Sequence, residues 1–353
     1  MVAPPVVECW PYPCRRSTRN RRTRRGAGVL AKVDGVVGYL VRRVIQAVVV
    51  VIGVVLIVFV LARIIPGGEA RAVLGPRATP KLVAEFNHVN GLTQPLWVQF
   101  WHYLLGVVQL HLGYSYQFTQ PVWAVIKRRL AKTVVLVATA LLLALVVAIP
   151  LGMYQVVKRD KLGDYTLTGL AFVLYASPTF FLGTLLIIWF SFDLHWLPVS
   201  PPANASAWAV FTDPRAFLMP VFTLSATTVA AFSRYMRSSL MDALAEDYIR
   251  TAKAKGASGK RVLYGHALRN ALIPIITLVG LTLPAIVSGA VIVEDLFNYP
   301  GMGLLIVQAA ENTDVPLVLG TTLVVTVTTV VGSLLADLLY VVVDPRIRYV
   351  RMT

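Results

Sequence analysis

The stretch EDYIRTAKAKGASGKRVLYGHALRNALIP, from Glu246 to Pro274, is charged and helix-prone, and it lies between two uncharged apolar runs. Apolar residues recur every four positions from just before this stretch into its first part, which predicts one apolar face of a helix. That face consists of Leu240, Leu244, Tyr248 and Ala252, with Ala245 and Ile249 beside it. Glu246 and Arg250 stand in the favourable order for an i,i+4 ion pair. A structured polar segment therefore separates two apolar segments.

The sequence also predicts where this first helix ends. Lys253 and Lys255 suit the negative end of the helix dipole, and Gly256 follows where a helix-ending glycine is expected. Ser258 can cap a second helix that extends through Arg269, after which Pro274 enters the next apolar run. Small residues crowd the junction and permit close approach by another protein: Thr251, Ala252, Ala254, Gly256 and Ala257. An amphipathic helix lying on the membrane is the alternative.

The composition is that of an integral membrane protein. Of 353 residues, 57% are hydrophobic and only 14% are charged, whereas soluble domains carry about 25% charged residues. The mean hydropathy is +0.69. The formal net charge of +16 would suggest nucleic acid as a partner of a soluble protein, but its distribution, described below, makes it a topology signal.

Six apolar stretches are long enough to cross the bilayer, which takes roughly 20 helical residues. We therefore predict an all-α membrane protein with six transmembrane helices. The stretches are Val44–Ala62, Thr133–Val157, Thr166–Phe192, Ala216–Ser233, Ala271–Val293 and Val315–Ala336, and none contains Asp, Glu, Lys or Arg.

The basic residues predict the orientation, because Lys and Arg concentrate in cytoplasmic loops. With the N-terminus inside, the inner segments are 1–43, 158–161, 234–270 and 344–353, and they hold 24 of the 33 Lys and Arg residues. Both termini are then cytoplasmic, in a multi-pass protein of the cell membrane. Four basic residues oppose this pattern on the outer side: Lys127, Arg128, Arg129 and Lys132.

These patterns divide the chain into four parts. Residues 1–38 are a basic tail that we expect to be disordered and cytoplasmic, and residues 39–65 hold the first transmembrane helix. Residues 66–130 form an extracytoplasmic segment, too long to be a structureless connector. Residues 131–353 form a core with five more transmembrane helices and an inner loop, 238–273.

The extracytoplasmic segment has two helix signals. Thr79 and Pro80 predict an N-cap and first turn, with Gly91 ending the helix near Asn90. A second helix, Pro95–Val108, carries apolar residues at helical spacing: Trp97, Phe100, Trp101 and Leu104. We expect it to lie on the membrane or on the protein's own outer face, and a docking surface for an external partner is the alternative.

Two further places are candidates for a substrate path or gate. Pro178 interrupts the third apolar stretch, and Ser177, Pro178 and Thr179 either shape a pore or form a packing kink. Glu294 and Asp295 follow the fifth stretch, where an acid either gates substrate or caps a turn. Pro300-Gly301-Met302-Gly303 predicts a tight turn, followed by a short helix over Gly303–Asn312.

Several motifs, taken in order, resemble those of ABC-importer permeases of the dipeptide, oligopeptide and nickel family, with a type I importer fold. EDYIRTAKAKG, continued by HALRNALIP, resembles the "EAA" loop of that family. The resemblance extends from about Tyr39 to the end and includes LGPRATP, GLTQP, PLGM at Pro150–Met153, EDLFNYPGMG at Glu294–Gly303 and DPRIR at Asp344–Arg348.

The resemblance implies that the inner loop is a coupling helix docking on cytoplasmic ABC ATPase subunits. Its contact residues would be Glu246, Asp247, Arg250, Thr251, Ala252, Ala254, Lys255 and Gly256. The sequence has no Gly-x-x-x-x-Gly-Lys-Ser/Thr loop, so we expect no cofactor and no catalysis here, with ATP and Mg²⁺ on the partner ATPases. The other implied partners are a paired homologous permease, an extracytoplasmic substrate-binding protein and the bilayer, with no nucleic acid.

The expected function is import of di- or oligopeptides. A permease for nickel chelates or another small solute is an alternative, and so is a six-helix secondary transporter. The last would need intramembrane charge for ion coupling, which the six apolar stretches lack. The scattered histidines predict no metal site.

Overall fold

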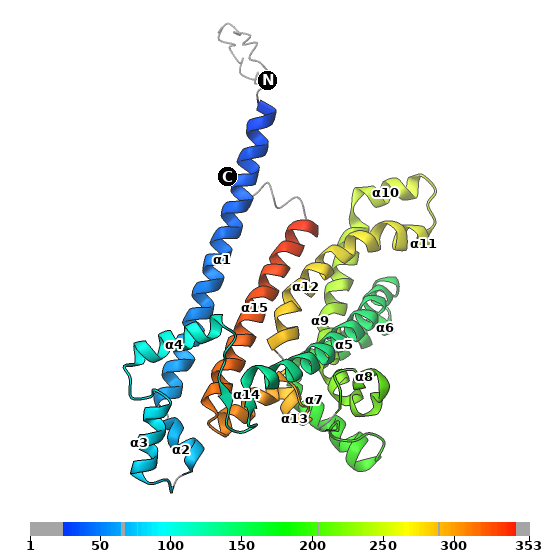
Figure 1. Ribbon diagram of the computed structural model, residues 1–353. Coiled ribbons are helices and arrows are strands. Elements are labelled where there is room, and N and C mark those ends of the chain that lie inside the picture. Colours follow the sequence, from blue (N-terminus) through cyan, green and yellow to red (C-terminus); the bar gives the residue numbers. More distant parts are fainter. Residues whose placement is uncertain (1–23, 65–67, 76, 203–204, 289, 344–353) are drawn as a thin grey trace, which may run out of the picture. The chain divides into compact units, whose positions relative to one another are not determined.

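The computed structural model describes residues 24–64, 68–75, 77–202, 205–288 and 290–343, and these are almost all helical (Figure 1). The chain forms two compact units, 1–48 and 49–353, and the packing below belongs to the second. Helix α1, Arg24–Ile64, begins earlier than predicted, so residues 24–38 are helical and not disordered. The sequence has no proline between Pro13 and Pro66 to stop the helix. The rest of the predicted tail lies outside the described residues.

In the described residues between α1 and α5, a segment that we predict to be extracytoplasmic, the chain forms three short helices and a small hairpin. These are α2 (Gly68–Leu74), α3 (Pro80–Val89), α4 (Leu96–Val108), β1 (Tyr114–Ser115) and β2 (Gln120–Pro121), with β1 and β2 antiparallel. Both helix signals are confirmed. The Thr79 hydroxyl accepts a hydrogen bond from the Leu82 amide, and Gly91 follows α3 with φ +66°.

Helix α4 divides its apolar residues between two faces. Phe100 and Tyr103 pack on Phe59 of α1, and the ring centroids of Phe59 and Phe100 are 5.3 Å apart. Trp97 and Trp101 point away and remain 74% and 59% exposed. One face of α4 thus packs on the protein itself, and an aromatic face is left exposed; that this is the outer side of the membrane remains a prediction.

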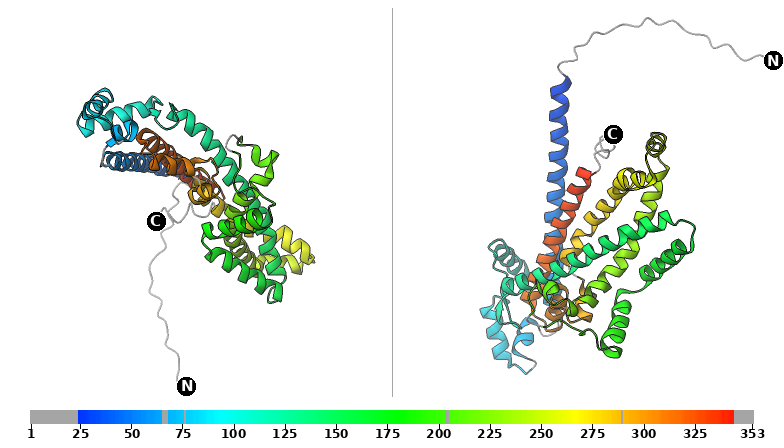
Figure 2. Two further views of the ribbon diagram at one scale, coloured as in Figure 1. Left: turned by 90° about the horizontal axis from the view of Figure 1, so that it is seen from below. Right: turned by 90° about the vertical axis from the view of Figure 1, so that its right-hand side faces the viewer.

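The core follows in the order α5 (Val122–Val157), α6 (Leu162–Ala176), α7 (Thr179–Leu186), η1 (Ile187–Asp193), α8 (Ala209–Thr212), η2 (Pro214–Ala216), α9 (Leu218–Ala245), α10 (Asp247–Ala254), α11 (Gly259–Arg261), η3 (Val262–Ala267), α12 (Leu268–Ser288), α13 (Val291–Leu296), α14 (Met302–Glu311) and α15 (Val315–Val343). Helix α5 lies along α9, and α12 lies along α15 (Figures 1 and 2). In the described residues, four helices are long and apolar enough to span a membrane, or five if α6 and α7–η1 count as one. The count of six remains a prediction.

Two predicted spans are interrupted. The third was expected to run unbroken apart from a kink over Thr166–Phe192, yet α6 and α7–η1 meet at 104°. Ser177 adopts an extended ψ of 131° there, because the ring of Pro178 disfavours a helical residue before it. The fifth was expected over Ala271–Val293, but α12 ends at Ser288 and Val291 starts the separate helix α13.

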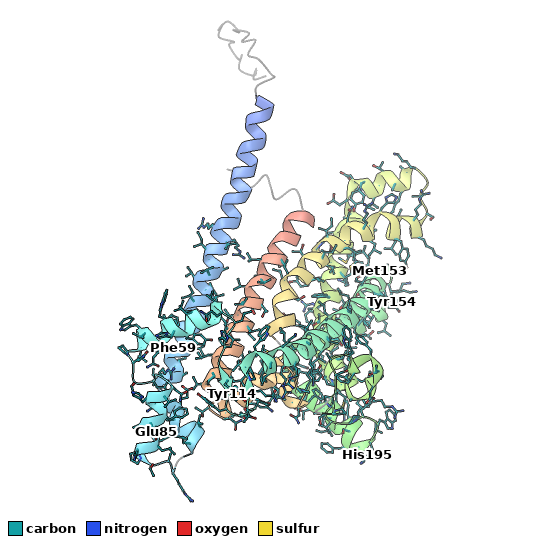
Figure 3. The ribbon with its side chains drawn as sticks, viewed as in Figure 1. Phe59, Glu85, Tyr114, Met153, Tyr154 and His195 are labelled. Carbon is teal, nitrogen blue, oxygen red and sulfur yellow. The ribbon has the colours of Figure 1, made fainter. Side chains whose placement is uncertain are left out.

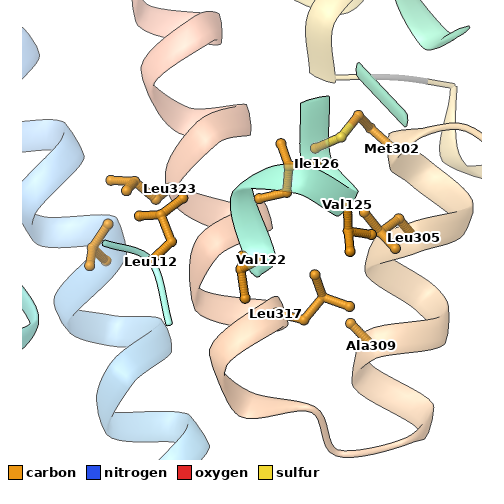
Figure 4. Packing of buried hydrophobic residues seen from close by; sticks show 10 residues of the cluster. Leu112, Val122, Val125, Ile126, Met302, Leu305, Ala309, Leu317 and Leu323 are labelled. Carbon is orange, nitrogen blue, oxygen red and sulfur yellow. The ribbon is translucent and has the colours of Figure 1, made fainter. Parts of the chain in front are cut away.

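The largest buried apolar cluster joins the first turns of α5 to α14 and α15 (Figure 4). Val122 and Ile126 of α5 are fully buried against it. Gly320 of α15 is needed for this packing, because a Cβ there would lie 2.5 Å from a methyl carbon of Val122. This packing holds the start of α5 against α14 and α15.

Candidate functional site: the inner helix pair

The inner loop begins with a sharp turn between α9 and α10. Glu246 ends one helix and begins the other with φ −69° and ψ 149°. The predicted continuous face from Leu240 to Ala252 is therefore wrong, because the helix axis changes at Glu246. Ile249 is the buried residue of α10, at 1% exposure, and Tyr248 is 37% exposed.

The end of α10 is a Schellman motif, as the glycine predicted. The Gly256 amide donates to the Lys253 carbonyl at 2.9 Å, and the Ala257 amide donates to the Ala252 carbonyl at 3.1 Å. These are the two bonds that define the motif. Gly256 has φ +83°, which is left-handed backbone that other residues rarely adopt.

The second helix starts where predicted but does not end there. The Ser258 hydroxyl accepts from the Arg261 amide at 3.4 Å. From there α11, the π-helical turns of η3 and α12 follow one another without a break. The predicted end near Arg269 is absent, because Pro274 lies inside α12 rather than at its start. The second part of the loop and α12 are therefore one continuous helical segment.

A buried cluster fixes α10 to the helices behind it. Ile249 packs with Leu240 of α9 and with Val262 and Ala267 of η3. Met153 of α5, labelled in Figure 3, extends the cluster. The predicted contact residues lie on the other side of α10. They are exposed except for Ala252, which is half-buried. The α10 unit, which consists of α10 with α11, therefore has a packed apolar side, called its back, and an exposed polar side, called its front.

The charge pairing on α10 differs from the expected one. Arg250 lies 3.4 Å from the Asp247 carboxylate, with both side chains at least 80% exposed, so Asp247 replaces the predicted partner Glu246. Such exposed pairs contribute little to stability. The exposed basic front also includes Lys253, Lys255, Lys260 and Arg261, and suits an acidic partner surface.

The predicted gate residues lie elsewhere. Ser177 and Thr179 are half-buried and Pro178 is exposed at the α6–α7 break, where the Ser177 hydroxyl donates to the Val173 carbonyl at 2.7 Å. The same carbonyl also accepts from the Ser177 amide at 3.0 Å, so the hydroxyl adds a second hydrogen bond at the end of α6.

Glu294 is fully buried and caps α14. Its carboxylate accepts from the Gly303 amide at 2.6 Å, the Leu304 amide at 3.3 Å and the Thr133 hydroxyl of α5 at 2.8 Å. Burial raises the pKa of this carboxyl above its ordinary value, and the donors oppose that shift. This geometry favours the turn-capping interpretation over a gate.

Comparison with known proteins agrees with this architecture. The family model described as "Binding-protein-dependent transport system inner membrane component" matches residues 148–349, and the model for the N-terminal part of such components matches residues 36–138. The chain belongs to this family. It is thus a multi-pass membrane component of a transport system, a permease rather than a catalytic subunit.

Curated relatives match almost the whole permease. It is 36% identical to the oligopeptide transport system permease protein AppB of Bacillus subtilis, over 88% of this chain and 99% of that protein. It is 35% identical, with the same coverage, to the glutathione transport system permease protein GsiC of Salmonella choleraesuis. It is 34% identical, again with this coverage, to a probable peptide ABC transporter permease protein, y4tP, of Sinorhizobium fredii.

Sequence reasoning missed the polar residues that join the permease's helices. Arg237 of α9 forms a two-bond ion pair with Asp164 of α6, and Asp314 accepts from Ser115 across 199 residues of sequence. A charged residue at the edge of an apolar stretch was the available signal. Its partner, distant in sequence, was not evident from spacing.

Proposed function

We propose that this permease is the membrane subunit of an ATP-driven ABC importer of di- or oligopeptides. The observation that carries the proposal is the α10 unit, whose front is exposed and polar while Ile249 fixes its back to α9 and η3. When a partner displaces α10, the helices packed behind it are displaced as well, because packed protein interiors deform little.

In this proposal, cytoplasmic ABC ATPase subunits bind the exposed polar side of α10. ATP and Mg²⁺ bind to those subunits, and this chain binds neither. Closure of the ATPases moves α10 as a lever, and the transmembrane helices rock between inward- and outward-facing states. The N- and C-termini lie on the cytoplasmic side with α10.

The remaining partners complete the path. A substrate-binding protein delivers peptide at the outer face, and a paired homologous permease provides the other wall of the path. Ser177, Pro178 and Thr179, at the α6–α7 break, are the proposed path residues of this chain. The relatives named above are described as transporting oligopeptides, glutathione or peptides, which favours peptides over nickel chelates.

Uptake of labelled di-, tri- and pentapeptides in a strain deleted for this gene, with and without the restored gene, tests the proposal. We expect peptide uptake to depend on the gene and on cellular ATP, and ⁶³Ni²⁺ uptake to depend on neither. Gene-dependent nickel uptake without peptide uptake would overturn the substrate assignment. Uptake that follows an ion gradient after ATP depletion would overturn the ABC mechanism.

A further inference from the structure

We propose that two arginines of α9 fasten α6 to α9, the helix that leads into α10, so that movement of α10 reaches the α6–α7 break. The two contacts are called straps below. Arg237 and Arg234 are the positioning residues, and neither is expected to touch substrate. The inference rests on the proposed transport function and adds the route by which force reaches the break.

The first strap is the pair of Arg237 and Asp164. The arginine Nε lies 2.9 Å from one carboxylate oxygen and an Nη lies 2.8 Å from the other. The Asp164 side chain is only 3% exposed. Two parallel charge-assisted bonds fix direction as well as distance, so α6 cannot turn on α9 without breaking them.

A polar network behind this pair extends it to α5. The Thr168 hydroxyl lies 3.4 Å from Asp164 and accepts from the Gln155 amide at 3.1 Å. Gln155 is fully buried. Three helices are therefore joined near the inner end of the bundle, where α9 leads into Glu246 and α10.

The second strap lies further along α6. The Arg234 guanidinium stands 4.5 Å from the ring centroid of Phe172 and 5.2 Å from that of Tyr175, which are cation–π distances. Tyr175 is two residues before Ser177, where α6 ends. The two arginines thus hold α6 at its first turn and at its last.

Beyond the break, α7 meets different surfaces. A Cβ at Gly183 would lie 2.5 Å from Leu296 of α13 and 3.4 Å from Thr223 of α9, so α7 packs closely on both helices. Of the two segments that meet at 104°, α6 is strapped to the part of α9 that adjoins α10, whereas α7 packs on α9 at Thr223, farther from α10. Displacement of α10 is therefore concentrated at the break between them.

The test uses the whole complex, purified with its ATPases and reconstituted in liposomes with the binding protein. The variants are Asp164→Asn, Arg237→Gln and Arg234→Ala. We expect peptide imported per ATP hydrolysed to fall at least about fivefold, the lower end of typical couplings between sites, with the ATPases still bound. Arg237→Lys, which keeps charge but loses the two-bond fork, should retain an intermediate ratio.

Asp160→Asn is the matched control. It makes the same chemical change four residues earlier, in an exposed pair with Arg159 at 3.4 Å, and should leave the ratio unchanged. If Asp164→Asn fails to accumulate, Arg234→Ala, which removes no buried ion pair, decides the question. A normal ratio in Arg234→Ala and in whichever Asp164 or Arg237 variants assemble would overturn the proposal.

A second measurement separates this inference from the proposed function. With Cys9 and Cys14 replaced by Ser, Ala176→Cys places one thiol at the exposed end of α6. Its alkylation rate should change when ATP and vanadate are added, and this change should disappear with Asp164→Asn. If the unmodified complex imports no peptide, the substrate assignment in the proposed function is wrong. If the alkylation rate of the introduced thiol still changes with ATP and vanadate in Asp164→Asn, the proposed role of the Arg237–Asp164 pair is wrong.

Discussion

Replacement of Gly256 tests whether the backbone cap of α10 controls docking. The φ of +83° at this position costs an alanine about 1–2 kcal/mol relative to right-handed backbone. A Cβ here would meet no described atom within 4 Å, so for alanine the penalty is conformational and not steric within this chain. The ratio of capped to frayed α10 should therefore fall about 5- to 30-fold in Gly256→Ala, the factor that such an energy gives.

The assay measures ATPase subunits retained on the affinity-purified permease, together with peptide uptake. We expect both to fall in Gly256→Ala and further in Gly256→Val, whose branched side chain suits positive φ least. Gly256→Asn should stay closest to the native protein, since asparagine tolerates left-handed backbone. Gly259→Ala is the control, because Gly259 has neither positive φ nor a close neighbour.

Two results would refute this reasoning. Normal ATPase retention and uptake in Gly256→Val would show that the cap is not needed for docking. Equal loss in Gly256→Asn and Gly256→Val, with Gly259→Ala normal, would show that side-chain volume at the interface matters and backbone conformation does not.

Three further predictions concern the outer half. Gly303→Ala should lower the thermal midpoint of the detergent-solubilised protein, because the new Cβ would lie 2.6 Å from the Val291 backbone and overpacking costs about 1–3 kcal/mol; an unchanged midpoint would contradict the packing described. Glu294 binds its proton more tightly when folded, since burial raises its pKa, so its contribution to stability should decline as pH rises from the ordinary pKa of 4.5 through the folded value. Glu294→Gln should remove that component of the midpoint's pH dependence, and an identical profile in both proteins would argue against it. Finally, we expect the exposed face of α4 to rest on the bilayer interface, where tryptophan concentrates. Lipids brominated near the headgroup should then quench the fluorescence of Trp97 and Trp101. If adding the binding protein abolishes this quenching, the face belongs to that partner instead.

The features predicted well from sequence are those in which cause and effect are close along the chain. Thr79, Gly91, Gly256 and Ser258 each act on backbone within about four residues, and all four perform the predicted role. A kink at Pro178 was predicted for the same reason, although a break of 104° between two separate helices was not. A proline excludes a helical residue before it, but tertiary packing decides how far the chain then turns.

The start of α10 shows where local reasoning fails. A period of four through Leu240, Leu244, Tyr248 and Ala252 is consistent with one helix, yet the chain turns at Glu246. The turn lets Ile249 fill the space between α9 and η3. Periodicity cannot reveal this, because the turn is stabilised by burial against residues on other helices, such as Leu240, Val262 and Ala267.

The buried acids explain why so apolar a chain keeps a few charges inside. Glu294 accepts hydrogen bonds from amides at the start of α14 and from a hydroxyl of α5. Asp314 likewise accepts hydrogen bonds from an amide of α15 and from a hydroxyl and an amide of the β1–β2 hairpin. An uncompensated acid in these places would be costly, so each is tolerated only with its partners in position. Apolar surfaces can slide past one another with little penalty, whereas these directional bonds cannot. In the mechanism proposed above, such bonds keep particular helices together, and the chain bends instead at breaks such as that at Pro178.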